Sequence, residues 1–434
     1  MGSTRVEREH DLIIIGGGIG GLISLKYAKD AGLDAVLLEQ GDSVGGLWRD
    51  LPAWQDLQIP KEDWTLGDLP IAGEDQASVL ANICSWVERF DLAPSIHLRT
   101  RVSSARPSDG GWEVSVGSDS FHARYLIAAT GGHNRPVVPQ VERVLPTLTE
   151  YHSSALRDPA ELTGKDVIVV GGGASAYDLL ELCLQREAGS VTWVYRSLKW
   201  MLPTRRPKYQ ATSLRALAKM QMLGTSLATM NKRANLDLRT RYKKAGIEEL
   251  LPDRAIDLGH QMLIPGRRRM IQDLGQIMRH RDEIVRIEGS TVQLSSGRSW
   301  RADLILWGTG YATDLSYLEA GDLSRLTHLD DIGRRCGSHF LALDAPNLFI
   351  LAPGVLETIT STPWAYAHAA KSIMSHIRGK PVFDAAPADT NANYFALVRF
   401  LARRDRVNYP RLRWYLKYLA LAFRQPAASP MPIP

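Results

Sequence analysis

The chain contains two glycine-rich loops, each placed between an apolar run and a helical pattern. The first reads "IIIGGGIGGL" at residues 13–22, and the second reads "IVVGGGASAY" at residues 168–177. An apolar run, a glycine turn, a helical pattern and a second apolar run together predict a βαβ unit in a parallel sheet. The helix opened by each loop presents free N–H groups to a phosphate. Two such loops predict two dinucleotide sites in one chain.

We therefore predict an α/β fold of two Rossmann-like dinucleotide-binding domains, with the second inserted into the first. A hairpin meander follows each βαβ unit. Each meander runs into a buried strand with a Thr-Gly turn, at 124–132 and at 302–311. The predicted boundaries are 1–158 for the first part of the first domain, 159–300 for the inserted domain, and 301–434 for the return to the first domain with C-terminal helices.

The first loop has Gly16, Gly18 and Gly21 at the G-x-G-x-x-G spacing. The first glycine permits a tight turn, the second lets the backbone approach a pyrophosphate, and the third lets helix and strand pack closely. Glu39 ends the next apolar run, where a carboxylate accepts ribose hydroxyls and repels a 2′-phosphate. This loop predicts FAD or NAD. The alternative is a chance glycine turn with a solvent-exposed Glu39.

The second loop repeats the pattern with alanine at the third position, and a cationic segment ends its next apolar run. Its predicted dinucleotide-binding residues are Gly171, Gly173, Ser175, Ala176, Arg196, Ser197 and Lys199. A guanidinium and a hydroxyl at the ribose suit a 2′-phosphate, so this loop predicts NADPH. The alternative is that Arg196 is an exposed strand-end residue without a specific partner. Hydride transfer between two bound cofactors then assigns FAD to the first loop.

Three more motifs extend this pattern: "GGLW" at 45–48, "ATGG" at 129–132 and "WGTGY" at 307–311. With the two loops, they make roughly residues 10 to 375 resemble the class B flavoprotein monooxygenases. That family includes the flavin-containing, the Baeyer–Villiger and the N-hydroxylating monooxygenases. The resemblance implies three further FAD contacts, Gly46, Trp48 and Thr130.

The resemblance also implies a reaction. NADPH reduces FAD, the reduced flavin forms a C4a-hydroperoxide with molecular oxygen, and the peroxide oxygenates a small organic substrate. We expect oxygenation at nitrogen or sulfur, because the Baeyer–Villiger fingerprint, with Trp four residues after the histidine, is not met at Leu156. The fingerprint of the wider family around His152 retains only that histidine and Ser153. We interpret His152 as a packed residue at the domain boundary, with catalysis as the alternative. Three other reactions stay open: Baeyer–Villiger oxygenation of a ketone, a flavin-dependent oxidase or halogenase, and an NADPH–flavin reductase.

Two candidate residues rest on the same resemblance. Gln58 takes the place of an asparagine that lies near the reactive edge of the flavin in flavin-containing monooxygenases, and it is our candidate catalytic residue. The alternative is an ordinary loop residue. Thr362 precedes Pro363 at a predicted helix start, and the corresponding helix in related flavoproteins points its positive end at the flavin. The alternative is an ordinary capped helix on the core.

Charge is concentrated in one segment of the chain. Residues 205–244 hold eleven Lys or Arg and one Asp, within a predicted helical insertion at about 205–250. This segment is either a solvated face or a docking surface for an acidic substrate or partner. No nucleic-acid recognition motif accompanies it, so we expect no nucleic-acid partner. The segment 411–424, "RLRWYLKYLALAFR", is predicted to pack on the protein, with membrane-surface binding as the alternative.

The remaining composition narrows the class of protein. Cys84, Cys183 and Cys336 are too widely separated for a C-x-x-C redox pair or a zinc cluster, so we expect neither disulfide exchange nor a metal. The chain has no run of about 18 apolar residues and no apolar N-terminal segment, which predicts a cytoplasmic protein without a transmembrane segment. The expected ligands are FAD, NADPH, molecular oxygen and a small-molecule substrate.

Overall fold

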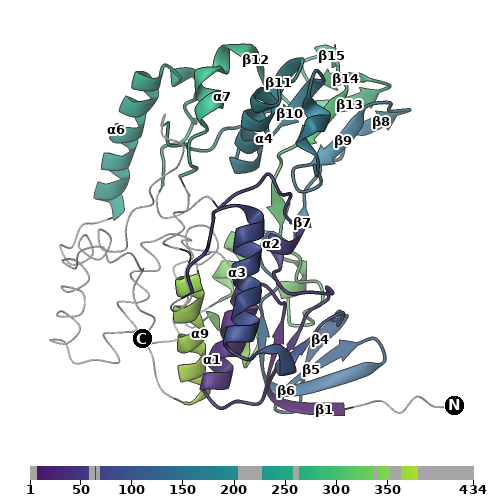
Figure 1. The fold of residues 1–434 in the computed structure, drawn as a ribbon, viewed down its shortest axis with the longest axis vertical. Coiled ribbons are helices and arrows are strands. Elements are labelled where there is room, and N and C mark those ends of the chain that lie inside the picture. Colours follow the sequence, from purple (N-terminus) through teal and green to yellow (C-terminus); the bar gives the residue numbers. More distant parts are fainter. Residues whose placement is uncertain are drawn as a thin grey trace.

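The computed structural model describes residues 7–57, 64, 69–203, 227–257, 263–336, 340–351 and 363–379. It contains two α/β units, each built around one glycine-rich loop. The unit with the first loop lies in the lower half of Figure 1, and the unit with the second loop lies in the upper half. Parallel strands dominate both units, so the predicted fold class is confirmed.

Of the described strands, seven form the sheet of the first unit, in the order β3-β2-β1-β6-β5-β4 with β18 beside β6. Their bounds are β1 Glu7–Ile15, β2 Ala35–Leu38, β3 Ile96–His97, β4 Ser104–Ser108, β5 Gly111–Val116, β6 Asp119–Ala128 and β18 Leu348–Ile350. Strands β4, β5 and β6 pair antiparallel, which confirms the predicted meander. The other pairs are parallel.

Both faces of β1 are buried, which explains its continuous apolar run. Successive strand residues point to opposite faces, so Leu12 and Ile14 pack in one core while Ile13 and Ile15 pack in the other. Helices α1, α3 and α9 cover the first of these faces, and α9 lies along α1 in Figure 1. The bounds of these helices are α1 Ile19–Asp30, α3 Gln76–Arg89 and α9 Pro363–Ile377.

The sheet of the second unit has the order β12-β11-β10-β16-β9, and all four of its strand pairs are parallel. Its bounds are β9 Thr149–His152, β10 Asp166–Val170, β11 Ser190–Tyr195, β12 Ile277–Arg281 and β16 Leu304–Trp307. The helices of this unit are α4 Ala174–Gln185, α6 Leu227–Ala245 and α7 Arg268–Gln272. The second predicted meander is confirmed as β13 Ile284–Glu288, β14 Thr291–Leu294 and β15 Ser299–Arg301, with β8 Glu142–Val144 beside β13.

The limits of the second unit differ from the predicted boundaries at 158 and 301. Strand β9 precedes the first boundary and β16 follows the second, yet both pair within the second sheet. The reason is the internal duplication, because β16 lies beside β10 as β6 lies beside β1. Each unit needs its own strand with a Thr-Gly turn to cover one side of its central strand. Counted from β8, the second unit begins near residue 142, and it ends near residue 307.

Short elements connect the two units. Strand β7 (Arg135–Pro136) pairs antiparallel with β17 (Tyr311–Ala312), so the outgoing and returning segments run side by side between the units. Two short helices complete the described α-helices, α2 Leu47–Asp50 and α8 Leu329–Arg334. The described residues also form five 3-10 turns, at Ala93–Ser95, Pro159–Leu162, Glu248–Leu250, Leu274–Gln276 and Leu323–Arg325.

Candidate functional site

The first glycine-rich loop lies at the carboxyl end of β1, and two of its predicted glycines, Gly16 and Gly21, have a steric role. Gly16 has a φ of +109°, and a Cβ there would lie 2.6 Å from the carbonyl oxygen of Ala129. Gly18 is the N-cap of α1, and no side chain caps that helix. A Cβ on Gly21 would lie 1.9 Å from the carbonyl oxygen of Gly16. The loop thus brings an uncapped helix N-terminus close to the strand end, which is a site for an anion.

Glu39 follows β2 beside this loop, and only 5% of it is exposed. Its Oε2 accepts the N–H of Gly17 at 2.6 Å, and its Oε1 accepts the N–H of Gly41 at 2.7 Å. Nη1 of Arg49 also donates to Oε1, at 3.3 Å. A carboxylate has about four acceptor positions, so about one is left for a ribose hydroxyl. The two backbone bonds hold the carboxylate in a single orientation.

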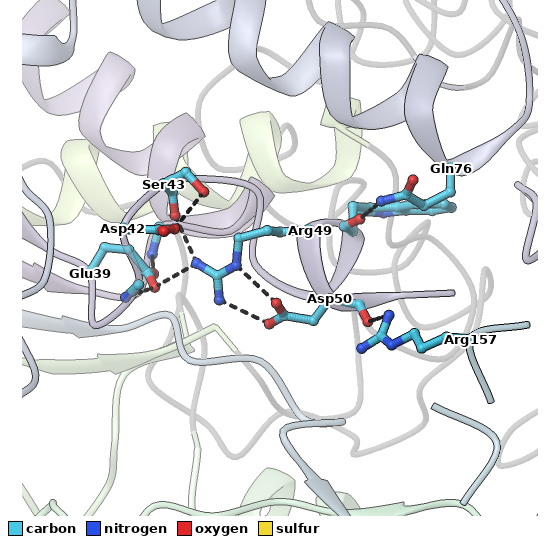
Figure 2. A network of polar contacts seen from close by, with 10 residues as sticks. Glu39, Asp42, Ser43, Arg49, Asp50, Gln76 and Arg157 are labelled. Atoms are coloured by element: carbon cyan, nitrogen blue, oxygen red, sulfur yellow. Dashed lines mark hydrogen bonds and ion pairs between the residues drawn. The ribbon is translucent and has the colours of Figure 1, made fainter. Parts of the chain in front are cut away.

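Arg49 connects Glu39 to the second unit, as Figure 2 shows. Its Nε and Nη2 donate to the two carboxylate oxygens of Asp50, each at 2.9 Å. The bond to Asp50 is the largest cause of an Arg49 pKa above its usual value, and Glu39 adds to it, so Arg49 stays protonated. The backbone carbonyl of Asp50 accepts Nη1 of Arg157 at 2.8 Å. A polar chain therefore runs from the first loop to the second unit.

The motif residues Gly46 and Thr130 lie against the same loop. A Cβ on Gly46, which has a φ of +53°, would lie 2.8 Å from the Cα of Gly18. The hydroxyl of Thr130 lies 3.2 Å from that of the partly buried Tyr317. The backbone carbonyl of Trp48 accepts a hydrogen bond from the side-chain amide of Gln76. The structure thus brings "GGLW" and "ATGG" together around the first loop.

A cavity of about 770 Å³ opens at this loop. The predicted residues that line it are Gly16, Gly18, Glu39, Gly46, Trp48 and Thr130. Gly21 is outside the lining, and its role is to let α1 pack closely against the backbone of Gly16. Our sequence reasoning missed other lining residues, among them Arg49, Arg101, His133, Asn134, Arg157 and Tyr311. Arg49 directly follows "GGLW", His133 and Asn134 follow "ATGG", and Tyr311 ends "WGTGY", which are signals that we could have used; Arg101 and Arg157 come from segments without such a motif.

The second loop has the same backbone design at the end of β10. Gly171 has a φ of +128°, and Gly173 is the N-cap of α4, again without a side-chain cap. Ala176 replaces the third glycine, and the space it needs comes from Gly308, where a Cβ would lie 2.6 Å from the Cα of Ala176. The carbonyl of Gly308 faces Gly171 as that of Ala129 faces Gly16 in the first loop. Glycine and alanine have therefore exchanged places between the two units.

Arg196 lies one residue beyond the position that is equivalent to Glu39, where the sequence had placed it. Leu38 pairs with the last residue of β1, and Val194 pairs with the last residue of β10. Tyr195 therefore holds the position of Glu39, and Arg196 lies one residue further along. An uncharged residue at the first of these positions removes the carboxylate that would repel a 2′-phosphate, and a cation follows it.

The cationic segment after β11 is open to solvent. The side chain of Arg196 is 77% exposed, and its Nη1 lies 3.9 Å from Glu283. Ser197 and Lys199 are exposed as well. Their backbone is held to the glycine loop, because the N–H of Lys199 donates to the carbonyl of Gly172 at 2.8 Å. The residues present at this loop fit a dinucleotide with a 2′-phosphate, and those at the first loop fit a dinucleotide without one.

His152 is buried at the end of β9, where its two ring nitrogens have partners. Nε2 lies 3.0 Å from the carbonyl oxygen of Gly310, and Nδ1 lies 2.8 Å from the hydroxyl of Ser154. The ring packs edge-on against Tyr311 with centroids 5.0 Å apart. Burial lowers the pKa of His152 below its usual value. These contacts agree with our interpretation of His152 as a packed residue between the units.

Several predicted features lie outside the described residues. They are Gln58, Thr362, residues 205–226 of the basic segment, and the segment 411–424. The described remainder of the basic segment belongs to α6, which buries Leu238 and Tyr242 and exposes its Lys and Arg side chains. Docking of an acidic partner to this helix stays a prediction.

The described residues add three observations on other kinds of site. All three cysteines fall among them and are free, with Cys84 exposed and the other two buried. In the same part of the chain, no group of three or more His, Cys, Asp or Glu is arranged to hold a metal ion. None of the helices described there has the length and apolar character needed to cross a membrane.

Comparisons with known proteins agree with this geometry. Residues 13–236 match the model of the pyridine nucleotide-disulphide oxidoreductase family. The FAD-binding monooxygenase VdtE of Byssochlamys spectabilis is 28% identical, over 56% of this chain and 44% of that protein. Dimethylaniline monooxygenase 2 (N-oxide-forming) of Oryctolagus cuniculus is 31% identical, over 44% of this chain and 40% of that protein. The chain spans less than half of the length of these relatives.

Among solved structures, an open crystal structure of cyclohexanone monooxygenase superimposes with a TM-score of 0.69. It is 16% identical, and the match covers 92% of this chain and 98% of that one, which shows a shared fold. Because the family model matches more than half of the chain, residues 13–236, the chain belongs to the pyridine nucleotide-disulphide oxidoreductase family. Within it, the predicted resemblance to the class B flavoprotein monooxygenases is confirmed.

Proposed function

We propose that this protein is an NADPH- and FAD-dependent monooxygenase that oxygenates a small organic substrate at nitrogen or sulfur. One observation carries the proposal: two loops of the same backbone design end in opposite charges, Glu39 at the first and Arg196 at the second. A carboxylate at the ribose position of the first loop, and a cation one residue beyond that position at the second, select two different dinucleotides. The cavity at the first loop is also lined by Ser154 and Arg157 of the second unit, so a dinucleotide bound at the first loop would face that unit.

FAD bound at the first loop would supply electron transfer from NADPH to oxygen. The chain's own residues would bind and orient it. The uncapped N-terminus of α1 would hold the pyrophosphate, and Glu39 would accept one ribose hydroxyl while Gly17 and Gly41 keep its carboxylate in place. Arg157 would keep the second unit against the first through Asp50. At the second loop, Arg196 and Lys199 would bind the 2′-phosphate.

Nitrogen or sulfur is the preferred substrate atom because a relative 31% identical to this chain is named as N-oxide-forming. To test this, purified protein loaded with FAD is incubated with NADPH, oxygen and one of three probes, N,N-dimethylaniline, thioanisole or cyclohexanone. Chromatography should detect the N-oxide or the sulfoxide. A lactone formed from cyclohexanone, with no N-oxide and no sulfoxide, would contradict oxygenation at nitrogen or sulfur and indicate Baeyer–Villiger chemistry. Hydrogen peroxide as the sole product with every probe would contradict oxygenation and favour an oxidase or reductase.

The NADPH assignment has a separate binding test. Arg196→Ala should weaken NADP⁺ binding about 10- to 100-fold and leave NAD⁺ binding within about twofold, because only NADP⁺ carries the phosphate that the guanidinium contacts. Calorimetric titration measures both dissociation constants. Arg286→Ala is the matched control, since Arg286 on β13 is paired with Glu142 on β8 and with Glu288, and it should change neither constant. Equal losses for both dinucleotides in Arg196→Ala would refute the role in 2′-phosphate binding.

A further inference from the structure

The two units place different side chains behind their glycine-rich loops. In the first unit, Leu22 follows the third glycine and Leu37 precedes the last residue of β2, and both are fully buried aliphatic residues. The equivalent residues of the second unit are Tyr177 and Trp193, which are equally buried. Each of these carries a polar group that leucine lacks. The internal duplication thus singles out two residues that distinguish the second site.

Both polar groups donate to backbone carbonyls of the second site. The indole N–H of Trp193 donates to the carbonyl of Gly171 at 2.6 Å. The hydroxyl of Tyr177 donates to the carbonyl of Lys199 at 2.8 Å. The two rings pack edge to face with centroids 5.8 Å apart. Trp193 therefore holds the backbone of the glycine loop, and Tyr177 holds the backbone of the cationic segment.

The cationic segment is seated directly on the glycine loop. A Cβ on Gly172 would lie 1.9 Å from the carbonyl oxygen of Ser197, and the N–H of Lys199 donates to the carbonyl of Gly172. The Tyr177 hydroxyl then holds the other polar backbone group of Lys199. Burial raises the pKa of Tyr177 far above its usual value, so the hydroxyl is a neutral donor at every working pH.

The first site has no need of this brace. Its selecting group, the Glu39 carboxylate, is itself buried and held by two backbone N–H groups. The selecting group of the second site is different, because the Arg196 side chain is 77% exposed and, among the described residues, its ion pair with Glu283 is a long one of 3.9 Å. An exposed guanidinium can be placed only through its backbone. The brace on residue 199 fixes the backbone three residues after Arg196.

We propose that Tyr177 is a positioning residue that makes the second site selective for a 2′-phosphate, and that Trp193 instead positions the loop for the pyrophosphate. This inference rests on the proposed assignment of NADPH to the second loop. It predicts different effects of the two residues on dinucleotide binding, whereas a general loss of packing would give the same effect for both. Loss of the Tyr177 hydroxyl should affect only a ligand with the 2′-phosphate, whereas loss of the Trp193 N–H should affect every dinucleotide.

The test uses Tyr177→Phe and Trp193→Phe in the full chain loaded with FAD, with NADP⁺ and NAD⁺ as calorimetric probes. Tyr177→Phe should raise the dissociation constant of NADP⁺ about three- to tenfold and that of NAD⁺ less than about twofold. Trp193→Phe should raise both by similar factors. Trp112→Phe is the control, because it removes an indole N–H that donates to the carbonyl of Pro346 in the first unit. It should change neither constant.

Equal effects of Tyr177→Phe on both dinucleotides, or no effect on either, would overturn the inference. Hydrogen exchange followed by mass spectrometry gives a second readout, since residues 196–200 should exchange faster in Tyr177→Phe; unchanged exchange there also counts against the inference. Arg196→Ala separates the two proposals. If it leaves the ratio of the two dissociation constants unchanged, the NADPH assignment fails. If it lowers the preference for NADP⁺ while Tyr177→Phe does not, only the positioning role fails.

Discussion

Replacing Glu39 with glutamine is the most direct test of the first site. The carboxylate accepts the N–H of Gly17 on one oxygen and the N–H of Gly41 on the other. A glutamine amide has one oxygen and one NH₂ group, so in either orientation it turns a donor toward one of these two N–H groups. Arg49 also loses the charge of its partner. The substitution keeps the shape of the side chain and changes its charge and its hydrogen-bonding chemistry.

The expected magnitude follows from these bonds. One unsatisfied buried N–H costs about 1–3 kcal/mol, so the free energy of unfolding of the protein without cofactor should fall by about that amount. A hydrogen bond from a ribose hydroxyl to a charged acceptor contributes about 1.5–3 kcal/mol. Its loss should weaken FAD binding roughly 10- to 150-fold. Both effects should occur in the same variant.

Two measurements check this prediction. Urea unfolding of the cofactor-free protein reports stability, and quenching of flavin fluorescence during titration reports the FAD dissociation constant. Glu113→Gln is the matched control, because Glu113 is also buried and paired with an arginine, Arg106, but lies outside the cavity lining. It should lower stability and leave FAD affinity within about twofold. A folded Glu39→Gln protein that binds FAD as tightly as the parent would refute the role of Glu39.

Two further predictions concern the second unit. Gly308→Ala places a Cβ 2.6 Å from the backbone of Ala176, so it should lower the melting temperature by several degrees or prevent folding, whereas Gly275→Ala, where no atom lies within 4 Å, should not. Glu150 accepts hydrogen bonds from Arg143 and Trp307, and the bond to Arg143 is the main cause of its lowered pKa. A lowered pKa contributes stability above the unfolded-state value of about 4.3. In urea unfolding, the loss of unfolding free energy in Glu150→Gln relative to the parent should therefore be constant from pH 8 to about 5.5. The loss should shrink as the pH falls through the folded-state pKa of Glu150. A loss that is independent of pH down to 3 would contradict the proposed stabilisation of the Glu150 carboxylate by Arg143.

The sequence by itself determined the parts of the protein that depend on neighbouring residues. A positive φ at Gly16 and Gly171 and the close approach of helix to strand are requirements of a short turn, so the glycine pattern alone predicts both loops and both βαβ units. The alternation of apolar residues likewise predicts the two meanders that the structure contains. The sequence also predicted the opposite charges of Glu39 and Arg196, because both follow directly on a strand of a βαβ unit. The sheet register, however, places Arg196 one residue beyond the position equivalent to Glu39.

Only the tertiary structure decided which distant segments meet. Arg157 reaches the carbonyl of Asp50 across 107 positions of sequence, and β16 joins β10 in the second sheet rather than returning at once to the first. The bond from Tyr177 to the carbonyl of Lys199 belongs to the same group, since a buried tyrosine has no periodic signature that names its partner. Such contacts depend on where the packed sheets and helices place each backbone group in space, and a local sequence pattern carries no information on that distance.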